Sequence, residues 1–189
     1  MAIKQQNTID ENGTAQANPR VGVGFAVTVA AFDAPQAIKN VSNFVCTGLN
    51  DQATINNAIN SIAQPTGIVV LSAGNFNCNA PVHTRKGISL LGAGRQTRLI
   101  AKFGDGTGVI IHNGTTRDNV QVSNLAIFGE GRDIHGILWN TGDSGFDEGP
   151  WPDANPLSYI DIADVARSGV SISGDSNRDI IGKRVRVLA

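Results

Sequence analysis

The sequence has little of several residues and patterns that mark common classes of protein. Its two cysteines are too few for a disulfide framework, and no Cys-x-x-Cys pair or Cys/His cluster indicates a zinc site. No apolar run approaches the roughly 20 residues that span a bilayer. The opening residues lack the apolar centre of a secretory signal. These absences predict a soluble protein that is made in a cytoplasm, does not insert into a membrane and carries no metal or other cofactor.

Net charge and aromatic residues are also scarce. The formal net charge is −1 and the isoelectric point is about 6.3, so no overall basic field favours binding to nucleic acid. Aromatic residues make up 5% of the chain, and there is a single methionine. By contrast, there are 22 glycines, with abundant Val, Ile, Asn, Asp, Ser and Thr. This balance predicts many short strands joined by tight turns.

Residues 1–40 differ in composition from the rest of the chain. The segment 7–20 is polar and has almost no large apolar side chains, so it cannot bury enough surface to fold alone. After it, alternating apolar residues predict a strand over Phe25–Val29. Two interpretations remain open: a flexible leader with one edge strand, or an arm that docks on a larger assembly by lending a strand. We therefore divide the chain into an extended attachment arm, residues 1–40, and a folded domain, residues 41–189.

A helix is predicted over about residues 51–62. Asn50 or Asp51 supplies its N-cap, and the segment 65–67 ends it. Apolar side chains recur at helical spacing on one face: Ile55, Ala58, Ile59 and Ile62. The opposite face is polar: Gln52, Asn56, Asn57 and Asn60. A single apolar stripe is typical of a lid that lies on a core.

Beyond Gly67 the apolar period changes from helical to strand-like, and short segments recur. Val120–Ala126 matches Ile160–Ala166 position for position, apolar on apolar. A second element pairs a glycine with a following apolar strand at three places: Gly108, Gly136 and Gly169. Two alternating strand types at intervals of roughly 20–40 residues predict a solenoid of stacked coils. An antiparallel sandwich is the alternative, and it is weaker because Asn-Gly hairpin signals are rare in the sequence.

Three segments carry a resemblance to a known family: residues 45–59, 67–78 and 87–95. The first contains the start of the predicted helix, the second ends in Ala-Gly-Asn-Phe-Asn-Cys, and the third reads Gly-Ile-Ser-Leu-Leu-Gly-Ala-Gly-Arg. This succession resembles the opening of pectate-lyase-like β-helix proteins, particularly those of bacteriophage tails. The resemblance implies an all-β fold: a right-handed single-stranded parallel β-helix with an N-terminal capping α-helix and an extended N-terminal arm.

The same resemblance implies a function. It favours a structural component of a bacteriophage tail, a minor tail or tail-spike-like protein that is located in the virion and assembled in the bacterial host cytoplasm. It also implies a homotrimer, attachment to other tail or virion proteins through residues 1–40, and contact with host-surface polysaccharide. The enzymatic alternative is a polysaccharide lyase or glycoside hydrolase, because this fold carries enzymes and inert spikes alike. A free microbial carbohydrate-binding module is a third class.

The last predicted strand helps to choose among these classes. It runs to Ala189, and no capping segment follows it in the sequence. An uncovered end of a solenoid exposes ladder residues and unpaired backbone, which proteins avoid. Two alternatives remain open: another chain covers this end, or the chain is the first part of a longer product. Both favour a component of an assembly rather than a free enzyme.

One segment interrupts the repeat and carries most of the candidate site residues. It follows Trp139 and combines aromatic side chains with carboxylates on a proline-stiffened loop. The candidates for glycan binding or for a subunit interface are Trp139, Asp143, Phe146, Asp147, Glu148, Trp151 and Asp153. Aromatic faces cover the C–H faces of sugars, while carboxylates accept bonds from hydroxyl groups. The interpretation that we favour is packing against a neighbouring subunit, ahead of glycan binding. Hydrolysis, with two acids flanking a glycosidic bond, is the weakest of the three. No residue is assigned a catalytic role.

The resemblance also places the two cysteines. Cys46 precedes the predicted helix, and Cys78 ends the first coil, so the two thiols are expected to meet beneath the lid. Two alternatives remain: a buried pair of apolar thiols, or a disulfide that forms after release from the cell.

A lyase of this fold would need a basic residue and acids that hold calcium. The sequence offers basic and acidic candidates for these roles: Arg132, Arg167, Arg178, Asp161 and Asp164. Asp161, however, alternates with Ile160 and Ile162, as an outward position on any strand does. The pattern therefore indicates a strand surface and not a calcium site.

Overall fold

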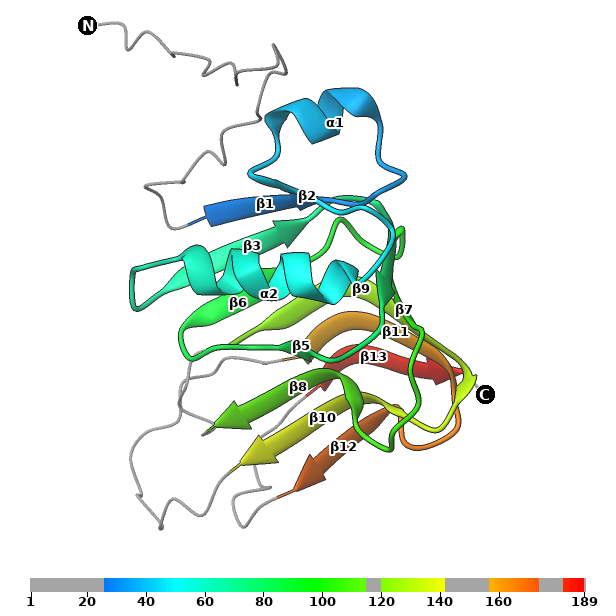
Figure 1. The fold of residues 1–189 in the computed structure, drawn as a ribbon. Helices are drawn as coiled ribbons and strands as arrows, with labels where there is room; N and C mark the ends of the chain where they lie inside the picture. Colours follow the sequence, from blue (N-terminus) through cyan, green and yellow to red (C-terminus); the bar gives the residue numbers. More distant parts are fainter. Residues whose placement is uncertain (1–25, 115–119, 142–156, 174–181, 189) are drawn as a thin grey trace, which may run out of the picture.

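The computed structural model describes residues 26–114, 120–141, 157–173 and 182–188. Within them the chain is mostly β, with two short helices that come early in the sequence (Figure 1). The helices are α1 (Gln36–Val41) and α2 (Asp51–Ser61). The strands are β1 (Ala26–Ala30), β2 (Phe44–Val45), β3 (Gly67–Leu71), β4 (Gly74–Cys78), β5 (Val82–His83), β6 (Ile88–Leu91), β7 (Thr97–Ala101), β8 (Gly108–Gly114), β9 (Val122–Arg132), β10 (His135–Thr141), β11 (Leu157–Val165), β12 (Val170–Ser173) and β13 (Gly182–Leu188).

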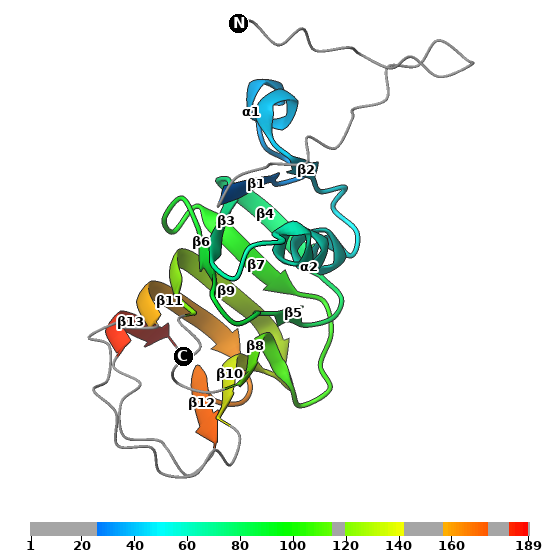
Figure 2. The same cartoon turned by 90° about the vertical axis from the view of Figure 1, so that its left-hand side faces the viewer.

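The strand pairings between the described residues are all parallel. The larger sheet has the order β13-β11-β9-β6-β3-β1-β2, and β4 and β7 join it through the pairs β4–β7 and β7–β9. The smaller sheet has the order β12-β10-β8-β5. Figures 1 and 2 show strands of the two sheets lying one beneath another, with α2 against the upper strands. The predicted β-rich class is thus confirmed, and the antiparallel alternative does not occur among these residues.

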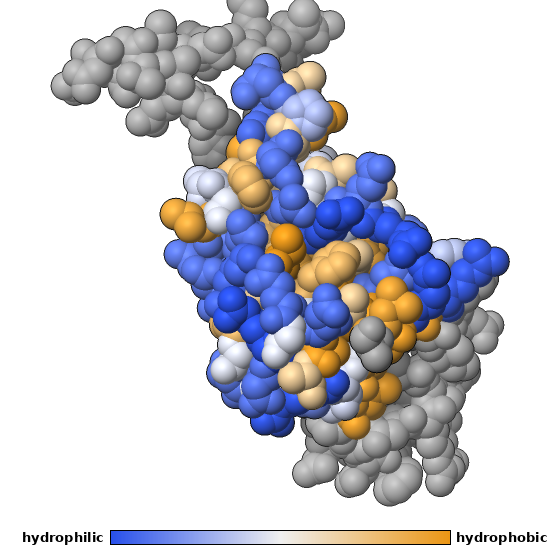
Figure 3. All heavy atoms as spheres, turned by 90° about the vertical axis from the view of Figure 1, so that its right-hand side faces the viewer, coloured by the Kyte–Doolittle hydropathy of each residue, from blue (hydrophilic) through white to orange (hydrophobic). Residues whose placement is uncertain are grey.

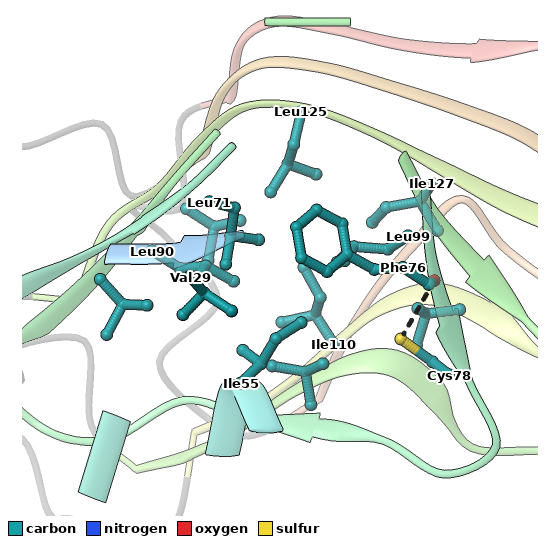
Figure 4. Packing of buried hydrophobic residues seen from close by; sticks show 14 of the residues in the cluster. Val29, Ile55, Leu71, Phe76, Cys78, Leu90, Leu99, Ile110, Leu125 and Ile127 are labelled. Atoms are coloured by element: carbon teal, nitrogen blue, oxygen red, sulfur yellow. Dashed lines mark hydrogen bonds between the residues drawn. The ribbon is translucent and has the colours of Figure 1, made fainter. Parts of the chain in front are cut away.

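Stacked strands place equivalent side chains above one another in the core. One ladder consists of buried side chains from successive strands of the larger sheet: Val27, Val69, Leu90, Val122 and Leu157. A second ladder runs down the β4–β7 side: Phe76, Leu99, Ile127, Ile162 and Val187. Figure 4 shows members of both ladders converging with Ile55 of α2. Each fully buried Leu, Ile or Phe contributes about 1.5–3 kcal/mol, so these ladders hold the stack together.

A bend recurs at the same level of three successive strands. Asn124, Tyr159 and Arg184 have φ values of 56°, 55° and 55°, and the register on either side of each places them opposite one another. Residues in this left-handed conformation break the strict alternation of strand side chains. Core positions in β9 therefore fall at Val122, Leu125 and Ile127.

This bend overturns part of the repeat alignment expected from the sequence. The register pairs Ile160 with Leu125, so Val120–Ala126 does not lie on Ile160–Ala166. The alignment of Gly136 with Gly169 agrees with the pairing of their following residues. Gly108, by contrast, pairs with His135, one residue before Gly136. Matching apolar residues alone misses the register because the bends make their spacing irregular.

Strand β1 belongs to the core rather than to a separate arm. It pairs with β3 and β2, and its Val27 and Val29 side chains are buried. The division at residue 40 therefore does not describe the packing of residues 26–34, which join the domain that follows. The partner of a strand cannot be read from alternation alone, so the sequence left this assignment open. Residues 1–25, most of the predicted arm, lie outside the described residues.

Helix α2 lies over the edge of β4 and β5 (Figure 2). Its buried face carries Ile55, Ala58 and Ile59, as the sequence predicts. Two side chains expected on the opposite, polar face do not simply point to water. The amide oxygen of Gln52 accepts a hydrogen bond from Asn79 N at 2.9 Å, and that of Asn56 accepts one from His83 N at 2.9 Å.

Acidic side chains continue this set of bonds along the edge of β4. Asp51, the first residue of α2, is fully buried, and its carboxylate accepts bonds from Thr47 N at 3.2 Å, Gly48 N at 2.9 Å and Asn77 N at 2.8 Å. Asp33 accepts a bond from Asn75 N at 2.8 Å. Side-chain oxygens therefore occupy the place that the carbonyl groups of another strand would take. Asn50 precedes α2 in the left-handed conformation and makes no side-chain cap bond.

Candidate functional site on the outer face of the large sheet

The outward side chains of β7, β9, β11 and β13 form two neighbouring rows. The charged row consists of Arg98, Ala126, Asp161 and Arg186. The apolar row consists of Ile100, Phe128, Ala163 and Leu188. The residues between the rows, Leu99, Ile127 and Ile162, are fully buried. Because side chains alternate along a strand, both rows face away from the core.

Asp161 is the acidic centre of the charged row and holds two arginines. Arg186 donates to it twice, from Nε to Oδ1 at 2.7 Å and from Nη2 to Oδ2 at 3.0 Å. Arg95, from the turn after β6, also forms an ion pair with it. The bond from Arg186 lowers the pKa of the Asp161 carboxyl, so the carboxylate is charged at neutral pH. Covered by these side chains, Asp161 is only 8% exposed, although it points outward as predicted.

Two further arginines on this face lie on aromatic rings. Arg98 Cζ is 5.8 Å from the centroid of Phe128, and Arg184 Cζ is 5.4 Å from the centroid of Tyr159. Both distances fall within the range of about 6 Å for cation–π attraction. Among the described residues, neither arginine has a carboxylate within ion-pair distance. Both guanidinium groups thus lie against aromatic rings, and no acid of the described residues neutralises their charge.

The pair of Tyr159 and Arg184 sits at the strained bend. Tyr159 is 44% exposed, and Arg184 is also exposed. A left-handed conformation costs a residue other than glycine or asparagine about 1–2 kcal/mol. Conformations of this kind concentrate at sites that bind or react. The two side chains therefore form an exposed aromatic and cationic corner beside the charged row.

Apolar surface accompanies these charges. Leu188 is 47% exposed at the end of the apolar row, and Phe128 is half-buried. Figure 3 shows one side of the molecule on which apolar side chains gather in a patch with hydrophilic ones around it. A surface that combines arginines with apolar contacts can bind a ligand that has both anionic groups and C–H faces.

Of the residues that the sequence selected for glycan binding or an interface, the structure describes Trp139, and it is not part of this surface. Trp139, in β10, is 2% exposed, and its ring stacks on His112 with centroids 4.3 Å apart. Its Nε1 has no hydrogen-bond partner among the residues that the structure describes. Trp139 therefore packs in the core instead of presenting its ring to solvent. The other candidates lie outside the described residues: Asp143, Phe146, Asp147, Glu148, Trp151 and Asp153.

The two cysteines are buried and free. Cys78 Sγ donates a weak bond to Phe76 O at 3.6 Å (Figure 4), and Cys46 Sγ donates one to Asp51 O at 3.9 Å. Burial, together with the nearby Asp51 carboxylate, raises the pKa of the Cys78 thiol to about 12 and also raises that of Cys46. The structure thus holds a buried pair of thiols, and the disulfide stays a prediction.

The basic residues considered for a lyase are engaged elsewhere. Arg132 donates from Nε to Ala101 O at 3.0 Å, and Arg167 pairs with Asp133 at 2.5 Å. Arg178 lies outside the described residues. Within the described ranges, no group of three or more His, Cys, Asp or Glu side chains could hold a metal ion. Neither described helix has the length and apolar character needed to cross a membrane.

The arginine-rich surface is what the sequence did not reveal. Its members come from three strands and a turn, separated by up to about ninety positions in the chain: Arg95, Arg98, Tyr159, Asp161, Arg184 and Arg186. The alternation around Asp161 was a usable signal for the outward direction. The register that brings Arg98 and Arg186 to the same row was not readable, because the bends at Tyr159 and Arg184 carry no glycine or asparagine.

Comparison with known proteins gives one similarity. No family model and no curated protein matches the sequence. Among solved structures, the protein ORF18 of Geobacillus virus E2 is similar with a TM-score of 0.47 and 20% identity. The similarity covers 65% of this chain but 25% of the viral protein, so the chain spans about a quarter of that protein's length. A likeness this low does not assign the chain to a family.

Proposed function

We propose that the chain is a structural component of a bacteriophage tail, a minor tail or tail-spike-like protein, folded as a right-handed single-stranded parallel β-helix. The observation that carries the proposal is the continuous stack of parallel strands, in which both sheets gain strands in succession from β3 and β5 onward. Helix α2 comes before these strands in the sequence and packs against the first of them, β3, β4 and β5, and a helix followed by such strands is the order of elements in the pectate-lyase-like proteins that residues 45–95 resemble. In this proposal α2 is the cap of the β-helix.

The assembly part of the proposal concerns the beginning of the chain and the number of copies. Residues 1–40 attach the protein to other virion proteins, and three copies associate side by side. The exposed Val41 and Leu49 side chains near the beginning of the domain support association, because exposed apolar residues gain from being covered. The outer face described above is free to contact polysaccharide of the host surface.

Light scattering coupled to size-exclusion chromatography tests the assembly. The expected mass is three times that of one chain of 19.8 kDa. A stable monomer at every concentration tested would contradict the trimer. In the genome that encodes the chain, genes for tail proteins should flank its gene, and their absence would contradict the tail assignment.

An activity assay separates this proposal from the enzymatic alternative. The protein is incubated with purified bacterial envelope polysaccharide, while reducing ends and the absorbance of unsaturated uronates are followed over time. A structural protein leaves both signals at the level of a buffer control. Release of reducing ends without unsaturated products would indicate a hydrolase, and release with them would indicate a lyase.

A further inference from the structure

We propose that the outer face of β7–β13 binds an acidic polysaccharide, with Arg98 and Arg184 as the two residues that engage its anionic groups. The inference rests on the proposed function, because it names the class of polysaccharide that the tail protein contacts. Its carrying observation is separate: two arginines, each stacked on an aromatic ring, flank a carboxylate that holds two other arginines.

The arginines of this face differ in whether a carboxylate of the described residues pairs with them. Arg186 directs its Nε and Nη2 donors at Asp161, and Arg95 shares the same carboxylate. Arg98 and Arg184 have no acidic partner among the described residues, and stacking fixes only one face of each guanidinium. Within the part of the chain that the structure describes, their N–H edges make no hydrogen bond and can donate to a ligand, and contact with the rings reduces the side-chain entropy lost on binding.

The charge on this face favours an anionic ligand. The rows and the bend carry four arginines and one aspartate among the described residues: Arg95, Arg98, Arg184, Arg186 and Asp161. Elsewhere among the described residues, Lys102 is paired with Glu130 at 2.7 Å and Arg167 with Asp133 at 2.5 Å. This face thus has a concentration of unneutralised positive charge in a chain whose net charge is −1. Carboxylate and phosphate oxygens match the donor edge of arginine.

The separation of the two stacked arginines favours a polymer over a small anion. Arg98 lies on β7 and Arg184 on β13, three strand steps apart in the sheet. At about 4.8 Å for each step, the separation along the stack is roughly 14 Å. A single carboxylate or phosphate cannot reach both, whereas a chain of sugars with repeated acidic groups can. The neighbouring apolar row, with Phe128 and Leu188, offers contact to the C–H faces of such sugars.

Binding to defined polymers tests the inference. The full chain is titrated with oligogalacturonate, which carries carboxylates, with poly(glycerol phosphate), which carries phosphates, and with neutral dextran. We expect at least one anionic polymer to bind and dextran not to bind. The double variant Arg98→Gln/Arg184→Gln should lower the affinity for the bound polymer at least tenfold. Comparison of the carboxylate and phosphate arms identifies which acid the face accepts.

Matched variants test whether binding depends on this face or on positive charge anywhere on the surface. Arg167→Gln removes one exposed cation from another part of the surface and should leave the affinity unchanged. Arg98→Lys/Arg184→Lys keeps both charges but loses the planar stacked group, and should recover only part of the affinity. Circular dichroism and thermal melting confirm that each variant is folded, so a loss of binding is not a loss of structure.

Three results would overturn the inference: no binding to either anionic polymer, equal affinity in the Arg98/Arg184 variant and the Arg167 control, or tighter binding to a single-stranded oligonucleotide of equal charge. The last result would point to a nucleic acid as the ligand. A protein that is trimeric but binds no acidic polysaccharide retains its proposed structural role and loses this inference. A monomer that binds through Arg98 and Arg184 retains the inference and loses the proposed assembly.

Discussion

The two edges of the strand stack are finished in different ways. At the α2 edge, alternate N–H groups of residues 75–83 donate to side chains of Asp33, Asp51, Gln52 and Asn56. Phe76 and Cys78 of this edge are fully buried. At the opposite edge, β13 pairs on one side with β11, and its Val187 and Leu188 side chains are 55% and 47% exposed. The same inward ladder is thus buried at one edge and half open at the other.

The difference shows how the unpaired edge of a strand can be covered without another strand. Carboxylate and amide oxygens from a helix accept the N–H groups that a neighbouring strand would otherwise bind, and the apolar face of the same helix covers the core. Unsatisfied backbone groups at a buried edge would each cost about 1–3 kcal/mol. One short helix therefore satisfies both the polar and the apolar requirements of the edge.

The largest contrast between the two edges is expected in thiol reactivity. In native protein at pH 8, Cys46 and Cys78 should react with Ellman's reagent at least about a thousandfold more slowly than a cysteine introduced by Val187→Cys, because burial raises their pKa. Stopped-flow absorbance measures the rates. In denaturant, all three thiols should react at similar rates. Two thiols missing from the denatured titration would mean that Cys46 and Cys78 are joined in a disulfide.

Truncation of one ladder at its two ends should give unequal losses of stability. Phe76→Ala is expected to lower the free energy of unfolding by about 3–5 kcal/mol, because it leaves a cavity in a fully buried site. Val187→Ala, at the exposed end of the same ladder, is expected to cost less than about 1 kcal/mol. Urea denaturation measures both. Equal losses would show that the far edge is covered in solution, for example by another copy.

Removal of the Asp51 carboxylate tests how much the side-chain hydrogen bonds at the α2 edge contribute to stability. Asp51→Ala leaves three N–H groups without an acceptor and should lower the free energy of unfolding by about 3 kcal/mol. The matched variant Asn57→Ala changes an exposed residue of the same helix and should stay within about 0.5 kcal/mol of the parent. Denaturation curves of the two variants give the comparison. A loss of less than 1 kcal/mol in Asp51→Ala would mean that water replaces the carboxylate.

A substitution in the bend near β13 should raise the free energy of unfolding instead of lowering it. Tyr159→Asn places a residue that tolerates the left-handed conformation at φ 55° and should raise the free energy of unfolding by about 0.5–1 kcal/mol. Tyr159→Phe keeps the ring and the strain and serves as the control, with no expected change. Thermal melting followed by circular dichroism is sensitive enough for both. A destabilised Tyr159→Asn would show that stacking with Arg184 outweighs the relief of strain.

The smallest expected effect is the dependence of stability on pH through Asp161. Its pKa is lowered in the folded protein by Arg186, so the stabilisation is present above the ordinary carboxyl pKa of about 4 and is lost as the pH falls below it. Asp161→Asn should therefore show a shallower loss of stability between about pH 4 and pH 2 than the parent. Urea midpoints at several pH values measure this slope. Parallel curves for the two proteins would contradict the assigned interaction.

The parts of the fold that rest on local pattern could be predicted from the sequence. The apolar spacing of Ile55, Ala58 and Ile59 indicates the helix that the structure has at Asp51–Ser61, and the strand-like period after Gly67 indicates the β-rich remainder. Register could not be predicted, because the bends at Asn124 and Tyr159 shift the core positions. The role of Gln52 and Asn56 could not be predicted either. A polar helix face that bonds to backbone N–H groups has the same sequence pattern as one that is exposed to water.

The candidate site, like the register, could not be predicted from local sequence pattern. Aromatic and acidic composition drew attention to the segment after Trp139, but Trp139 itself is buried. The arginine surface depends on the order of strands, which only long-range pairing determines. Arg98 and Arg186 lie in the same row because Arg98 pairs with Ala126, Ala126 with Asp161, and Asp161 with Arg186. The sequence around either arginine does not indicate these pairings.

The ladder from Val69 to Leu157 also bears on how such a protein can change over evolutionary time. Successive members lie 21 residues apart between Val69 and Leu90, but 35 apart between Val122 and Leu157, and both steps advance the stack by one strand. The extra chain is added between strands, without altering the ladder contacts. Insertions between strands can therefore be acquired, exchanged or lost while the core keeps its register. A lineage with this architecture can remodel its surface rapidly without having to redesign its interior.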